Sequence, residues 1–89
     1  MDLKDKNIII TGGSLGIGKS TAINLLNRGA NVLVTGRSVE RLSKVFKGTK
    51  VQFCAFDISD FTNLNHYAQK IIKNFNNRVD VLINNAGIG

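Results

Sequence analysis

The chain has 89 residues, 43% of them hydrophobic, and a net charge of +6 from 12 basic and 6 acidic side chains. This length suits one small domain, and a single cysteine excludes an intrachain disulfide. There is no membrane-length apolar run and no secretory signal pattern, and the basic side chains are scattered without an aromatic platform. We therefore expect a cytoplasmic protein that binds neither membrane nor nucleic acid.

Four short apolar runs predict strands. Each run is rich in Val, Ile or Phe and too short for a buried helix. They lie at residues 7–11, 31–35, 50–56 and 79–83.

Three stretches with apolar residues at helical spacing separate these runs, at residues 17–26, 39–46 and 61–75. Gly29 and Gly48 lie where helices are expected to stop, and Ser38 lies at an expected N-cap, as does Ser59 or Asp60. The order β-α-β-α-β-α-β predicts an α/β fold with a doubly wound parallel sheet.

Right-handed crossovers give this sheet the strand order 3-2-1-4 and leave the fourth run on an open edge. That run is almost entirely apolar, as an interior strand would be. We therefore expect residues 1–89 to be one half of a fold truncated after its fourth strand. An open edge also offers a surface for self-association.

A glycine-rich turn, Thr-Gly-Gly-Ser-Leu-Gly-Ile-Gly, follows the first run at residues 11–18. Glycine permits the positive φ and the close backbone approach that a strand-to-helix turn needs. The free N–H groups at the start of the next helix attract anions. The turn therefore predicts a nucleotide-phosphate site.

Two motifs fit this turn. From Gly12 it is a Rossmann-type dinucleotide loop, with one residue more between its first two glycines than G-x-G-x-x-G. From Gly13 it is the Walker A loop of P-loop NTPases, in which Lys19 would reach the phosphates and Ser20 would bind Mg²⁺. The pattern of the turn does not choose between them.

The residues after the second and third runs bear on this choice. In a dinucleotide-binding fold the residue at the end of the second strand faces the adenosine ribose. An acidic side chain there binds the 2′-hydroxyl, whereas an arginine pairs with a 2′-phosphate. Gly36 stands in the place of the acid with Arg37 beside it, which favours NADP(H) over NAD(H). Asp57 and Ile58 suit adenine, although in a P-loop enzyme Asp57 would be a metal ligand.

Asn84-Asn85-Ala86-Gly87 follows the fourth run, and at this point the chain resembles the short-chain dehydrogenase/reductase family over essentially its whole length. The glycine-rich turn, Asp57-Ile58 and the Asn-Asn-Ala-Gly segment each follow their own strand in the family's order. The resemblance favours the dinucleotide interpretation and makes the Walker A match a coincidence.

The resemblance implies a cofactor site built from four strand ends. The glycine-rich turn would hold the pyrophosphate and its ribose, and the residues after the second strand, with Ser14, would hold the 2′-phosphate. The residues after the third and fourth strands would line adenine and the middle of the cofactor. In chain order these residues are Gly12, Ser14, Gly16, Ile17, Gly18, Arg37, Ser38, Asp57, Ile58, Asn85, Ala86 and Gly87.

Family members transfer a hydride between nicotinamide and a carbonyl or alcohol carbon, with a tyrosine as acid/base, a lysine four residues later and a serine. These groups belong after the Asn-Asn-Ala-Gly segment, whereas Tyr67 precedes it and has Lys70 three residues on. We expect the cofactor-binding, adenosine-side half of an NADP(H)-dependent oxidoreductase, inactive alone; a non-catalytic dinucleotide-binding module is the alternative. No acidic residue or cysteine lies at ligand spacing from His66 in the sequence, and Cys54 lies in a predicted strand, so no metal site is expected.

Overall fold

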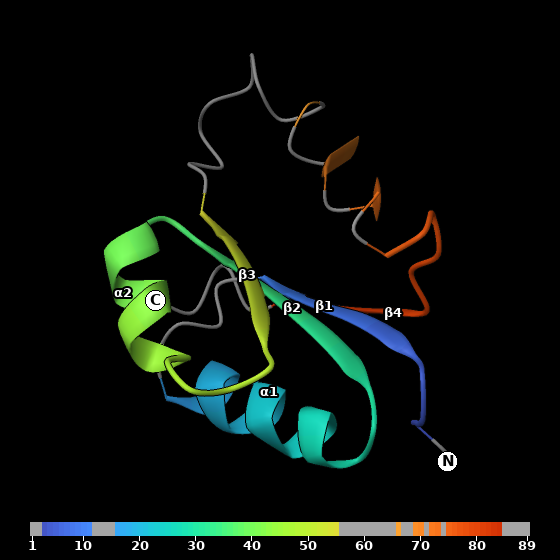
Figure 1. Ribbon diagram of the computed structural model, residues 1–89, viewed down its shortest axis with the longest axis horizontal. Coiled ribbons are helices and arrows are strands. Elements are labelled where there is room, and N and C mark those ends of the chain that lie inside the picture. The colour runs from blue at the N-terminus through green and yellow to red at the C-terminus, as the bar shows by residue number, and fades with distance from the viewer. Residues whose placement is uncertain are drawn as a thin grey trace.

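Four parallel strands form one sheet in the order β3-β2-β1-β4 (Figure 1). In the computed structural model β1 (Asn7–Thr11) pairs with both β2 (Asn31–Gly36) and β4 (Val81–Asn84), and β3 (Gln52–Ala55) pairs with β2. The predicted parallel sheet and its strand order are therefore confirmed. The structure describes residues 3–11, 16–55, 66, 69–70, 72–73 and 75–84.

The two helices α1 (Ile17–Asn27) and α2 (Val39–Val45) lie on one side of the sheet, and the described residues between 66 and 75 lie on the other (Figure 1). Side chains alternate between the two faces of a strand, and this alternation divides the core. One cluster joins the sheet to both helices: Ile8, Ile10, Ala22, Ala30, Val32, Val34, Leu42, Phe46 and Val51. A second cluster contains Ile9, Leu33 and Phe75.

The turn after α1 is built around Gly29, which adopts the left-handed φ of 93°. The N–H of Gly29 donates to the carbonyl of Leu26 (3.0 Å), and the N–H of Ala30 donates to that of Leu25 (3.2 Å). These two bonds are the Schellman arrangement that satisfies carbonyls at a helix C-terminus. The glycine stop predicted from the sequence is confirmed.

The limits of α2 also follow the sequence. Ser38 is its N-cap, and the Ser38 hydroxyl oxygen accepts a hydrogen bond from the N–H of Arg41 (3.2 Å). The helix ends at the C-cap Phe46, and Gly48 takes a φ of 77° in the turn that follows.

The third and fourth strands each begin two residues later than the sequence predicts. Before β3, the Thr49 hydroxyl donates to the Phe46 carbonyl (2.7 Å) and accepts from the N–H of Val51 (3.3 Å), which holds the chain in a turn. Before β4, the carboxylate of Asp80 accepts the N–H of Asn7 (2.8 Å) in place of a strand carbonyl.

The third predicted helix is described only in part. His66, Gln69, Lys70, Ile72 and Lys73 are helical, while Ser59, Asp60 and Tyr67 lie outside the described residues. Within the described part of the chain, no helix has the length and apolar character needed to cross a membrane.

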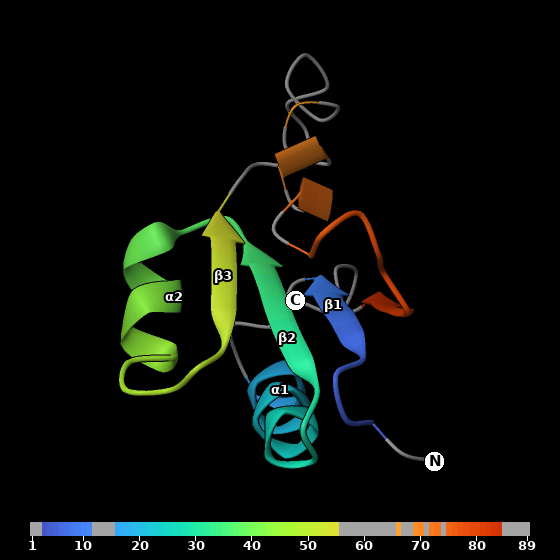
Figure 2. The same cartoon turned by 45° about the vertical axis from the view of Figure 1, so that its right-hand side comes forward.

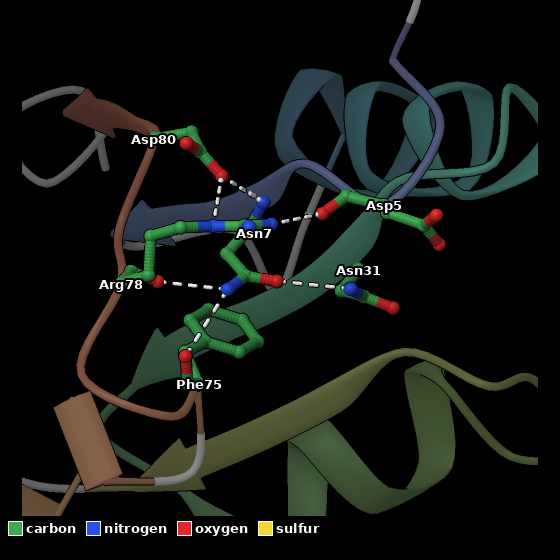
Figure 3. A network of polar contacts seen from close by, with 6 residues as sticks. All are labelled: Asp5, Asn7, Asn31, Phe75, Arg78 and Asp80. Carbon is green, nitrogen blue, oxygen red and sulfur yellow. Dashed lines mark hydrogen bonds and ion pairs between the residues drawn. The ribbon is translucent and has the colours of Figure 1, made fainter.

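Asn7 is a polar residue at the start of β1 that is only 6% exposed. Its side-chain NH₂ donates to the carbonyls of Phe75 (3.2 Å) and Arg78 (2.8 Å), and its side-chain oxygen accepts from the side-chain amide of Asn31 (2.9 Å) (Figure 3). The backbone carbonyl of Asn7 also accepts the N–H of Asp80 (2.9 Å). One side chain therefore joins the turn before β4 to the amino ends of β1 and β2.

Replacing Asn7 with alanine removes the donor for two carbonyls and the acceptor for Asn31. A buried donor or acceptor left without a partner destabilises the folded state by more than a hydrogen bond normally stabilises it. We therefore expect the free energy of unfolding to fall by about 3 kcal/mol. Asn31→Ala removes one of these bonds at an exposed residue and should cost about 1 kcal/mol. Chemical denaturation measures both, and equal losses would contradict the central place of Asn7.

Asp80 makes stability depend on pH. Its pKa lies below the ordinary 3.8, chiefly because the carboxylate accepts the backbone N–H of Asn7, with further lowering by Arg78 and Lys6. The Nε of Arg78 lies 3.2 Å from the Asp80 carboxylate (Figure 3). Since the folded protein holds this proton less tightly than the unfolded chain, the stabilisation is complete above the unfolded pKa and is lost as pH falls through the folded one.

Asp80→Asn should therefore lower the thermal midpoint at neutral pH and flatten its fall in acid, below about pH 4. Asp5→Asn removes the same charge nearby and serves as the control. Thermal unfolding followed across this pH range tests the assignment, and parallel profiles for Asp80→Asn and the unmodified protein would refute it.

Candidate functional site

The carboxyl ends of the parallel strands meet at one edge of the sheet, as the aligned arrowheads of β1, β2 and β3 in Figure 2 show. Thr11 at the end of β1 is in register with Thr35 of β2 and with Asn84 of β4, and Gly36 is in register with Ala55 of β3. The strand order changes direction at β1, because β2 and β3 lie on one side of it and β4 lies on the other. In open α/β sheets, the crevice at such a switch point is where ligands bind.

The N-terminus of α1 lies at this edge, after β1. Its N-cap, Gly16, has a φ of 52°, and among the described residues other than its chain neighbours no atom lies within 4 Å of the position that a Cβ there would take. The first turn contains no acidic side chain, and Ile17 is 74% exposed. The first N–H groups of a helix have no acceptor within it and carry the positive end of its dipole. Within the described part of the chain, no acidic side chain opposes an anion at this end of α1.

Gly18 and the two residues after it differ in burial. Gly18 is buried one turn before Ala22, a core residue, and the lack of a side chain suits close packing of the helix on the sheet. Lys19 and Ser20, which complete the Walker A pattern, are both exposed on α1.

A second polar position follows β2, the neighbour of β1. Arg37 is exposed between the strand and α2. The Ser38 oxygen accepts the N–H of Arg41, and a serine hydroxyl that accepts one bond keeps its own proton for a further acceptor. Arg37 and Ser38 therefore offer a guanidinium and a hydroxyl donor beside each other.

Comparison with known proteins identifies the family to which this chain belongs. A family model described as short chain dehydrogenase matches residues 6–89. The chain belongs to the short-chain dehydrogenase family.

Two curated relatives are similar to nearly the whole chain. Retinol dehydrogenase 13 of Homo sapiens is 36% identical over 90 residues, which covers 93% of this chain and 27% of the relative. L-rhamnose 1-dehydrogenase (NADP(+)) of Thermoplasma acidophilum is 38% identical over 96 residues, which covers 99% of this chain and 37% of the relative. The chain thus spans between a quarter and two fifths of the length of these two dehydrogenases.

A solved structure shares the fold. The crystal structure of a metagenomic short-chain oxidoreductase in complex with NADP matches with a TM-score of 0.85 and 34% identity. The match covers 100% of this chain and 42% of that one.

Five of the residues predicted to bind cofactor lie at the two positions described above, after β1 and after β2. They are Gly16, Ile17, Gly18, Arg37 and Ser38. The others lie outside the described residues: Gly12, Ser14, Asp57, Ile58, Asn85, Ala86 and Gly87.

Sequence reasoning missed the neighbour of Gly36. A Cβ built on Gly36 would lie 3.3 Å from both terminal methyl carbons of Leu42. The helical pattern identified Leu42 only as a buried position, because nothing in the sequence pairs a helix residue with a strand residue six positions before it.

Gly16→Ala should lower the free energy of unfolding by about 1 kcal/mol, because an L-residue is strained at positive φ. The space around the added methyl group is open, so no packing cost is added. Lys19→Ala, at an exposed helical position, is the matched control and should leave stability unchanged within about 0.5 kcal/mol. Denaturant titration compares them, and a Gly16→Ala protein as stable as the parent would contradict the left-handed conformation.

Proposed function

We propose that this chain is the cofactor-binding half of an NADP(H)-dependent oxidoreductase that transfers a hydride between the nicotinamide and a carbonyl or alcohol carbon of a small molecule. The strongest support is that two positions with donors suited to an anion follow neighbouring strands at one sheet edge. One is the open N-terminus of α1, and the other is Arg37 with Ser38. NADP(H) carries two anionic groups, a pyrophosphate and a 2′-phosphate, on either side of the adenosine ribose, and this pair of positions suits them.

The roles follow from the chemistry of each position. The N–H groups at the start of α1 would bind the pyrophosphate, since Gly16 brings no side chain and the first turn no negative charge. The Arg37 guanidinium would pair with the 2′-phosphate, with the Ser38 hydroxyl as a second donor. The same proposal assigns the remaining contacts to Gly12, Ser14, Asp57, Ile58, Asn85, Ala86 and Gly87.

The absence of an acid at position 36 favours NADP(H) over NAD(H). A carboxylate at the end of β2 would bind the ribose 2′-hydroxyl and would repel a 2′-phosphate. Two similar proteins also support this preference, since one is an L-rhamnose 1-dehydrogenase (NADP(+)) and the other was crystallised with NADP. Family membership likewise favours a dinucleotide over ATP at the glycine-rich turn.

Proton transfer completes a carbonyl reduction, and we assign it to the part of a full-length short-chain dehydrogenase that this chain does not cover. In this chain, α1 and the ends of β1 and β2 would hold the adenosine side of the cofactor. Their contribution to the reaction is to fix the cofactor in position, which lowers the entropic cost of aligning the hydride with the substrate carbon.

Arg37→Ala should weaken NADPH binding about 10- to 100-fold, the loss expected for hydrogen bonds to a charged group, and leave NADH binding almost unchanged. Arg28→Ala is the matched control, because Arg28 is also exposed but caps the opposite end of α1. Titration calorimetry of the full-length protein with each nucleotide measures the effect. Equal weakening of NADH and NADPH, or an equal effect of Arg28→Ala, would argue against a 2′-phosphate site at Arg37.

A further inference from the structure

The segments that lead into the strands carry much of the positive charge of this protein. All strands of a parallel sheet begin at the same edge, so these segments meet there although they lie far apart in the sequence. In Figure 2 the segments before β1, β2 and β3 lie at the end opposite the arrowheads. Six of the 12 basic residues belong to the segments before the four strands, and all six are exposed. We call them the amino-edge cluster: Lys4, Lys6, Arg28, Lys47, Lys50 and Arg78.

Hydrogen bonds hold three of these segments against one another. The N–H of Asp5 donates to the carbonyl of Gly29 (3.0 Å), the residue that directly follows Arg28. The guanidinium of Arg78 donates to the carbonyl of Asp5 (Figure 3). Because Asp5 stands between the two lysines of its own segment, four members of the cluster lie on backbone segments that are in contact.

The two remaining members extend the cluster to the far side of β2. Gln52 of β3 is in register with Leu33, so Lys50 precedes β3 at about the level where β2 begins at Asn31. Lys47 lies in the turn between α2 and Lys50. The amino-edge cluster therefore extends from the turn before β4 to the turn before β3.

Acidic side chains do not balance this charge. In the described part of the same segments the acids are Asp5 and Asp80. The Asp80 carboxylate already accepts the N–H of Asn7 (2.8 Å) and lies 3.2 Å from the Nε of Arg78. Like charges that are held close together repel one another and destabilise the folded state. An anion that lies among the six cations would relieve this repulsion.

We propose that the amino-edge cluster binds an extended acidic segment of a partner protein. Four strands about 4.8 Å apart span about 14 Å, and an extended chain rises about 3.3 Å per residue. A run of about five acidic residues therefore crosses the edge and meets cations along its length. The cluster lies at the edge opposite the proposed cofactor site, so the protein can hold the acidic segment and a dinucleotide together.

The surroundings of the cluster favour an acidic protein over a nucleic acid or a membrane. Proteins that bind single-stranded nucleic acid add exposed aromatic side chains to their cations, whereas Phe46 and Phe75 beside the cluster are each only 2% exposed. Surfaces that bind anionic membranes add apolar side chains that enter the lipid. In the described part of the segments before the strands, the exposed large apolar residue is Val79, at 39%. Pairing with carboxylates needs neither kind of side chain.

The test is the fluorescence anisotropy of a labelled hexaglutamate peptide titrated with the full-length protein at low ionic strength. A triple variant, Lys6→Gln with Lys47→Gln and Lys50→Gln, removes three charges of the cluster from two of its segments. It should weaken peptide binding about tenfold, the combined loss expected for three exposed ion pairs. Added salt should weaken the binding of the unmodified protein, because it screens exposed charges.

The matched control is a second triple variant, Lys19→Gln with Lys44→Gln and Lys70→Gln. It removes the same charge from exposed residues of α1, α2 and the third helical stretch, outside the cluster. Its affinity for hexaglutamate should stay within about twofold of that of the unmodified protein. The thermal midpoint of the cluster variant should be no lower than that of the control, so that weaker binding does not reflect unfolding.

Two results would overturn the inference. Equal weakening in the two triple variants would mean that the peptide responds to net charge alone. Tighter binding of an oligothymidylate or of phosphatidylserine vesicles than of hexaglutamate would assign the cluster to a nucleic acid or a membrane. The inference does not rest on the proposed function: NADPH affinity should be the same in the cluster variant as in the unmodified protein, and failure to bind NADPH would contradict the proposed function alone.

Discussion

Parallel pairing of β1 with β2 on one side and β4 on the other is the constraint on which the structure depends. Parallel neighbours require crossovers that return the chain to the same end of the sheet, so both faces must be covered. The sequence Ile8-Ile9-Ile10 meets this requirement directly, because its alternate side chains enter separate core clusters. The same pairing collects the carboxyl ends of all four strands at one edge.

The two edges of the sheet differ in how their polar groups are satisfied. At the amino edge, the Asn7 side chain donates to two carbonyls of the turn before β4 and accepts from Asn31, and the Asp80 carboxylate accepts the backbone N–H of Asn7. At the carboxyl edge, α1 begins without a side-chain cap or an acidic residue in its first turn. The described residues thus supply partners for the polar groups of the amino edge, and we propose that the donors at the start of α1 bind a ligand at the opposite edge.

Much of the fold follows from local patterns in the sequence. Four apolar runs, the Ser38 cap and the Gly29 stop depend on neighbouring residues, and right-handed crossovers then fix the strand order. The starts of β3 and β4 do not follow, because Val51 and Val79 are apolar but bonds made by Thr49 and Asp80 keep both outside the strands.

The site is predictable to a similar extent. The spacing of the glycines predicts an anion site and Arg37 predicts that the anion is a 2′-phosphate, because each prediction depends on the residues at a single strand end. The burial of Asn7 and the contact between Gly36 and Leu42 depend on residues from different elements, and no pattern along the chain contains them.

The most direct test of this cofactor site is a crystal structure of the full-length protein with NADP⁺ bound. We expect the pyrophosphate at the N-terminus of α1 and the 2′-phosphate beside Arg37; a nucleotide bound away from the ends of β1 and β2 would contradict the proposed site.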